Sequence, residues 1–171
     1  QIRGLTTAQV ASLTTDQLVS MGTDQVAAFT TAQITALTTK LVVALTTDQA
    51  SSLTTAQAAS LTTAQIVAIE TDDLQAMTTA QMVALTTAQM PALTTAQVVA
   101  LTSDQVSSLK TAQLASLSTA QIAVIETDDL VGLSTAQIRG LTTAQVASLT
   151  TDQLVSMGTD QVAAFTTAQI T

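Results

Sequence analysis

Hydrophobic residues recur every eight positions along the whole sequence. Stepping by eight from Leu5 reaches an apolar residue 21 times, ending at Phe165, with no insertion or deletion. We number the octad from this residue, so that Leu5–Ser12 reads LTTAQVAS. Position 6 is also apolar throughout, and position 5 is Gln in nearly every octad. The pattern indicates a tandem array of identical structural units.

Longer repeats lie above the octad. Residues 1–35 recur identically as residues 137–171, and TAQIVAIETDDL at 63–74 closely matches TAQIAVIETDDL at 119–130. The second pair lies 56 residues, or seven octads, apart. We therefore expect residues 1–171 to form one continuous array, taken from a longer repeat region. The second offset suggests about seven octads in each turn of the superstructure.

Neither a long helix nor a plain strand fits this spacing. Eight residues turn an α-helix through about 800°, so positions 1 and 6 would spiral around it without forming one stripe. In a strand, positions 1 and 6 point to opposite faces, and each face would mix apolar with polar residues. The spacing favours a short helix that starts again in each octad.

Each octad contains the signals of a helix start. Thr or Ser at position 2 with Gln at position 5 is the spacing of a capping box, and positions 1 and 6 have that of a hydrophobic staple. Small residues at position 8 would allow a tight turn, and Pro91 at position 7 would be tolerated near a helix end. Representative capping pairs are Thr6 with Gln9, Thr14 with Gln17, Thr94 with Gln97, and Thr142 with Gln145.

Because such short helices are unstable alone, they must stack. We predict an all-α solenoid with one very short capped helix per octad and the apolar positions inside. A β-solenoid is the alternative, since Thr and Val favour strands and repeated Gln could stack in ladders.

Composition narrows the possible functions. The sequence has no Cys and no His, and its formal net charge is −8 with four Lys and Arg residues. These features argue against nucleic-acid partners, anionic membranes and catalysis by His or Cys. No apolar run approaches the roughly 18 residues of a membrane span. We expect neither an enzyme, nor a small-molecule substrate, nor a bound cofactor other than a possible calcium ion.

Two acidic octads are the most site-like feature. Carboxylates are calcium ligands, but the glycines of calcium-binding loops are missing, and acids in a first helical turn also favour the helix dipole. The candidate ligands are Glu70, Asp72, Asp73, Glu126, Asp128 and Asp129.

Threonine allows two further interpretations. Position 3 is more strictly Thr or Ser than position 2, so its hydroxyl could cap the helix where position 2 is Gly, Glu or Lys, or could bond a neighbouring turn. A regular Thr array could also bind ice, although helix capping already accounts for the Thr residues at position 2.

The segments LTTAQVAS (5–12) and LTTAQVVA (93–100) resemble the Thr/Ala/Gln-rich octapeptide tracts of very large secreted or surface-exposed bacterial proteins, some of them adhesin-like. This resemblance implies an extracellular or cell-surface location and a structural or adhesive role. We expect a structural protein that self-associates into a filament or forms a surface stalk. A calcium-binding or partner-binding repeat module of an adhesin is the alternative.

Overall fold

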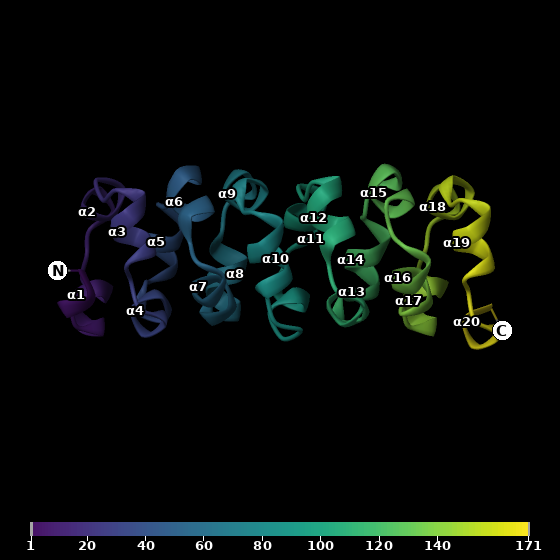
Figure 1. Ribbon diagram of the computed structural model, residues 1–171, viewed down its shortest axis with the longest axis horizontal. Coiled ribbons are helices and arrows are strands. Elements are labelled where there is room, and N and C mark those ends of the chain that lie inside the picture. The colour runs from purple at the N-terminus through teal and green to yellow at the C-terminus, as the bar shows by residue number, and fades with distance from the viewer. Residues whose placement is uncertain (1, 171) are drawn as a thin grey trace. The chain divides into compact units, whose positions relative to one another are not determined.

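The computed structural model describes residues 2–170, which divide into two compact units, Gln1–Leu85 and Thr86–Thr171. Each unit is a succession of very short helices (Figure 1). The first contains η1 (Ile2–Gly4), α1 (Thr7–Ala11), α2 (Thr15–Val19), α3 (Thr23–Ala27), α4 (Thr31–Ala36), α5 (Thr39–Val43), α6 (Thr47–Ser52), α7 (Thr55–Ser60), α8 (Thr63–Ala68), α9 (Thr71–Ala76) and α10 (Thr79–Ala84).

The second unit has the same organisation. It contains η2 (Met90–Ala92), α11 (Thr95–Val99), α12 (Ser103–Ser108), α13 (Thr111–Ser116), α14 (Thr119–Ala123), α15 (Thr127–Val131), α16 (Thr135–Arg139), α17 (Thr143–Ala147), α18 (Thr151–Ser156), α19 (Thr159–Ala163) and α20 (Thr167–Ile170). No strand occurs within residues 2–170, so the all-α solenoid is confirmed and the β-solenoid alternative is wrong.

The octad sets where each helix begins and ends. Position 2 is the N-cap, with extended backbone angles, and position 3 is the first helical residue, as at Thr6 and Thr7. The helix then runs through position 7 or 8. Its exit needs no left-handed residue, because no residue between 2 and 170 has a positive φ. Conformation at the turn is therefore not the reason for small residues at position 8.

Within each unit, α-helices pack against the third α-helix after them, as α1 against α4 and α12 against α15 do. In the first unit α1, α4, α7 and α10 form one such row, and α3, α6 and α9 form another (Figure 1). Side-chain hydrogen bonds join residues 28 and 31 positions apart, as between Gln65 and Leu37 or Ile34. A turn of the coil thus takes 28 residues, or 3.5 octads. The estimate of seven octads per turn is wrong: 56 residues correspond to two turns.

The core is built from positions 1 and 6. Side chains at position 6, such as Ile66 and Leu114, are 0% exposed, and those at position 1, such as Leu37 and Leu93, are 3–4% exposed. The methionines Met82 and Met90 also lie in this core. Because both positions recur in each octad, the core is continuous along each unit.

Pro91 changes the geometry of its octad. The proline has no backbone N–H to donate to a carbonyl four residues earlier, so this octad forms a turn and the 3-10 helix η2 in place of an α-helix. Met90 nevertheless remains fully buried. The substitution alters the helix type and preserves the core position.

Candidate functional site

Glutamine at position 5 closes the helix start. Its side-chain oxygen accepts a hydrogen bond from the backbone N–H of the N-cap residue, and the N-cap hydroxyl accepts one from the backbone N–H of the glutamine. At Thr142 and Gln145 these bonds measure 2.8 and 3.2 Å. Both bonds are also present in the pairs Thr6–Gln9, Thr14–Gln17 and Thr94–Gln97.

The nitrogen of the same glutamine side chain bonds the preceding coil, and this interaction was not predicted. In the second unit Gln145 Nε2 donates to the carbonyl oxygens of Leu114 and Leu117 at 2.8 and 2.7 Å. In the first unit Gln57 Nε2 donates to those of Val26 and Phe29 at 3.0 and 2.8 Å. Each acceptor pair consists of position 6 and the next position 1. One side chain therefore joins the start of its own helix to the end of a helix one coil earlier.

We call this set of contacts the glutamine ladder, made by the buried position-5 glutamines and the carbonyls at positions 6 and 1. Its members in the interior are about 2% exposed, as at Gln65 and Gln121. A buried amide is stable only when its polar atoms have partners. The ladder provides them: Gln121 Nε2 donates to the carbonyl oxygens of Met90 and Leu93 at 3.0 and 2.7 Å.

In the two acidic octads, aspartate replaces glutamine at position 5. Asp73 and Asp129 are each 4% exposed, and the N-cap glutamates before them make no side-chain cap bond. Burial, followed by repulsion from Glu70 and Asp72, raises the pKa of Asp73 to about 6. Asp129 accepts a hydrogen bond of 2.6 Å from the Ser103 hydroxyl. These carboxylates thus lie at ladder positions and lack the amide donor.

The acidic side chains do not assemble into a metal site. Within residues 2–170, no group of three His, Cys, Asp or Glu side chains is placed to hold a metal ion. The buried Asp73 and Asp129 occupy the ladder positions, whereas Asp72 and Asp128 belong to the first helical turns of α9 and α15. Calcium binding stays a prediction that this arrangement does not favour.

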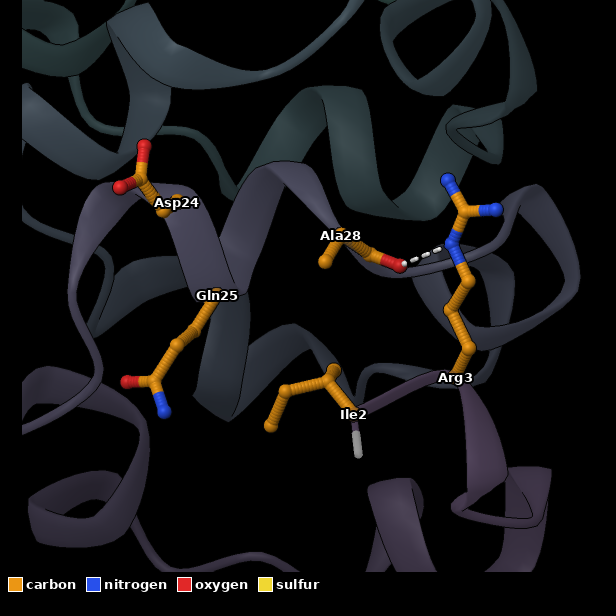
Figure 2. Close-up of a pocket in the computed structure, with 5 residues that line it drawn as sticks. All are labelled: Ile2, Arg3, Asp24, Gln25 and Ala28. Atoms are coloured by element: carbon orange, nitrogen blue, oxygen red, sulfur yellow. Dashed lines mark hydrogen bonds between the residues drawn. The ribbon is translucent and has the colours of Figure 1, made fainter.

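A cavity of about 490 Å³ opens beside the first coil, lined by Ile2, Arg3, Asp24, Gln25 and Ala28. Figure 2 shows the Gln25 amide extending from its helix beside Ile2, and the Arg3 guanidinium on the other side of the opening. Arg3 Nε donates to the Ala28 carbonyl at 3.3 Å. Gln25 uses its oxygen to cap its own helix at Gly22. The cavity lies where, in later octads, the carbonyls of a preceding coil meet the glutamine.

Comparison with known families identifies the repeat. A family model described as the ALTTAQ repeat matches residues 1–23, 12–39, 66–103 and 122–159, which together make up more than half of the chain. The chain belongs to the ALTTAQ repeat family. Comparison with curated proteins found no match.

Residues 84–89 and 92–97 both spell the ALTTAQ hexapeptide, and the second copy shows the structural roles of its Leu, Thr and Gln residues. Its Leu is the core residue at position 1, its first Thr is the N-cap and its second Thr begins the helix. Its Gln completes the capping box and supplies the ladder amide. The family motif is therefore the combination of a helix start and an inter-coil bridge.

The first Ala of ALTTAQ, at position 8, faces the preceding coil. Gly140 holds this position, and a Cβ atom there would lie 1.8 Å from Thr111 Cγ2. In the same positional pair of another octad, Ser52 Oγ donates to the Thr23 carbonyl at 3.4 Å. Small residues at position 8 thus permit contact with the threonine at position 3 of the coil before.

The same contact bears on the strictness of position 3 in the ALTTAQ octad. Where position 2 is not Thr or Ser, the N-cap stays at position 2 without a side-chain cap bond, so position 3 does not take over capping. In one of these octads Thr111, at position 3, instead lies against Gly140 of the next coil. Ser103, in an octad with the ordinary N-cap Thr102, also reaches the next coil, through its hydrogen bond to Asp129. The five octads without Thr or Ser at position 2 have N-caps Gly22, Glu70, Lys110, Glu126 and Gly158.

Within residues 2–170, no helix of this ALTTAQ array combines the length and apolar character that a membrane crossing needs. The threonine hydroxyls at position 2 are engaged as helix caps, as at Thr62 and Thr102. These hydroxyls therefore already accept hydrogen bonds from the backbone of their own helices.

Proposed function

We propose that the chain is a structural spacer, which serves as an extracellular filament or as the stalk of a surface protein. The observation that carries the proposal is the glutamine ladder. Each octad adds one short helix and one pair of core residues, and the glutamines of the ladder add bridges to the coil before them. Units that contact only their neighbours gain length and total stability with each repeat, which is the behaviour of solenoid proteins.

The surface suits a role as a spacer. The formal charge of −8 keeps neighbouring chains from sticking nonspecifically, and the absence of Cys from the sequence means that the array needs no disulfide to hold its coils together. The location outside the cell is supported by the resemblance to repeat tracts of secreted and surface proteins. Antibody labelling of intact and permeabilised native cells tests it: labelling only after permeabilisation contradicts an outside location.

The spacer role predicts that the length of the molecule is proportional to its number of octads. Deleting residues 63–118 removes seven octads and joins Thr62 to Thr119, a seam that restores the sequence TTAQI. We expect the maximum dimension in small-angle X-ray scattering to fall by about a third, with an unchanged cross-section. A chain whose dimensions follow those of a compact globule, with no such proportional loss, refutes the proposal.

A further inference from the structure

The two acidic octads share the sequence ETDDL, but their ladder positions are connected to the preceding coil in different ways. In the second unit the Ser103 hydroxyl, at the start of α12, donates to the Asp129 carboxylate on α15 at 2.6 Å. In the first unit the equivalent hydroxyl belongs to Thr47, at the start of α6. Within residues 2–170 the Asp73 carboxylate accepts no hydrogen bond from Thr47 or from any other donor. One acidic octad is therefore joined to the coil before it by a carboxylate bond, and the other is not.

The protonation state of Asp73 decides whether it can donate a hydrogen bond. In the register of the ladder, position 5 corresponds to the carbonyls 28 and 31 residues earlier, which for Asp73 are those of Leu45 and Val42. The Val42 carbonyl accepts from the Leu45 backbone N–H at 3.2 Å, whereas the Leu45 carbonyl receives no glutamine amide within residues 2–170. An ionised carboxylate has only acceptor atoms, but a neutral carboxyl group has one O–H donor. A proton therefore gives Asp73 the kind of donor that glutamine supplies elsewhere in the ladder.

The charged side chains on the helices around Asp73 are acidic in the first unit. Glu70 caps α9 and Asp72 lies in its first turn, and Asp48 lies in the first turn of α6, which packs against α9. The helices next in sequence, α8 and α10, have no charged residue. Lys40 belongs to α5, which packs against α2 and α8. Burial, followed by repulsion from Glu70 and Asp72, raises the pKa of Asp73 to about 6.

We propose that the contact between α6 and α9 depends on a proton, being stabilised when Asp73 is neutral and weakened when Asp73 is ionised. The neutral carboxyl group carries a donor and is not repelled by the neighbouring acids. The ionised group is a buried charge that lacks both a donor and a cation. The contact between α12 and α15 needs no such proton, because the Ser103 hydroxyl donates to the Asp129 carboxylate. This inference goes beyond the spacer role, since it gives one coil of the array a response to acidity.

The direction of the pH effect follows from the raised pKa of Asp73. The closed contact holds the proton more tightly than an opened α9 does, so acid stabilises the contact. The stabilisation is fully present below pH 3.8 and is lost as the pH rises through about 6. Between pH 5 and pH 7.5 the opening equilibrium of α9 should therefore increase about tenfold.

Backbone hydrogen exchange of the 171-residue chain at pH 5 and pH 7.5 tests the proposal, after correction for the intrinsic exchange rate at each pH. We expect the amides of α9 to be about tenfold better protected at pH 5. The amides of α15 are the internal control, because they lie in an octad of nearly the same sequence whose carboxylate has a hydroxyl donor. Their protection should change little.

Substitutions at position 73 separate its proton from those of the neighbouring acids. Asp73→Asn has nearly the same size and cannot ionise, so its α9 should be protected at pH 7.5 as well as that of the wild type at pH 5. Asp73→Gln introduces the side chain of the other ladder positions and should also remove the pH dependence. The matched control Asp16→Asn removes an exposed acid from α2, which packs against α5, and should keep the pH dependence of the wild type.

Three results overturn the proposal: equal protection of α9 at both pH values, equal changes in α9 and α15, or a pH dependence that persists in Asp73→Asn. If Asp73→Asn does not fold, the first two comparisons still decide, because they use the wild-type chain. An array that ignores pH but whose length follows its octad number leaves the spacer role intact. The two proposals therefore fail separately.

Discussion

Gln145 and Gln9 lie in identical sequences, but within residues 2–170 only Gln145 has a coil before it. Both side-chain oxygens accept from the N-cap N–H at 2.8 Å. Only Gln145 also donates, at 2.8 and 2.7 Å to Leu114 and Leu117. Replacing either residue with Glu keeps the capping acceptor and removes the amide donor. The pair of substitutions therefore separates the bridge from the cap.

The expected loss at Gln145 follows from the two bonds. Gln145→Glu leaves the Leu117 carbonyl without its donor, whereas the Leu114 carbonyl still accepts from the Leu117 backbone N–H at 3.1 Å. A buried polar group without its partner costs about 1–3 kcal/mol. Because Gln145 is 2% exposed, water does not replace the amide. The free energy of unfolding should fall by about 1–3 kcal/mol. Gln9 is exposed, and Gln9→Glu should change it by no more than about 0.5 kcal/mol.

Urea denaturation followed by far-ultraviolet circular dichroism measures both losses. The ladder predicts a lower midpoint for Gln145→Glu and a midpoint close to that of the wild type for Gln9→Glu. If the two variants lose equal stability, the contribution of glutamine is confined to the cap, and the reasoning about the inter-coil bridge is wrong.

Three further predictions follow from the same contacts. In thermal unfolding, Gly140→Ala should destabilise the chain by about 1–3 kcal/mol relative to Gly4→Ala, because a Cβ at Gly140 would clash with Thr111 and a Cβ at Gly4 meets no neighbour. Equal effects of the two substitutions would contradict that packing. The raised pKa of Asp73 means that its folded state holds the proton more tightly, so stability is lost as pH rises from 3.8 to about 6. Asp73→Asn should therefore gain about 1–3 kcal/mol more at pH 7 than below pH 3.8, and a pH-independent difference contradicts burial and carboxylate repulsion as the cause of the raised pKa. Removal of divalent ions with a chelator should leave the melting temperature unchanged, and a large drop would support calcium binding by the acidic octads.

The local structure could be predicted from the octad because its signals act over short distances. Thr at position 2, Gln at position 5 and the apolar pair at positions 1 and 6 all lie within one helix and its flanking turn. The spacing between Thr6 and Gln9 is enough to place a cap. The sequence therefore indicates one helix per octad without reference to any neighbouring coil.

The coil itself depends on contacts between residues 28 and 31 positions apart, which no local signal specifies. The residues found at position 5 give one indication of the inter-coil hydrogen bond. A capping box accepts Glu as readily as Gln, yet position 5 contains no Glu in any octad. Because Glu lacks the amide donor, its absence indicates a second bond from the nitrogen. The acceptors of that bond, such as Leu117 for Gln145, follow only from the stacking of coils.

The most direct test of the glutamine ladder is detection by nuclear magnetic resonance of scalar coupling across its hydrogen bonds. The account predicts couplings from the Gln145 side-chain nitrogen to the carbonyl carbons of Leu114 and Leu117, and none from Gln9 in the 171-residue chain. Coupling of Gln145 to carbonyls at any other spacing, or an amide of Gln145 that exchanges with solvent as fast as that of Gln9, would contradict a coil of 3.5 octads held by glutamine.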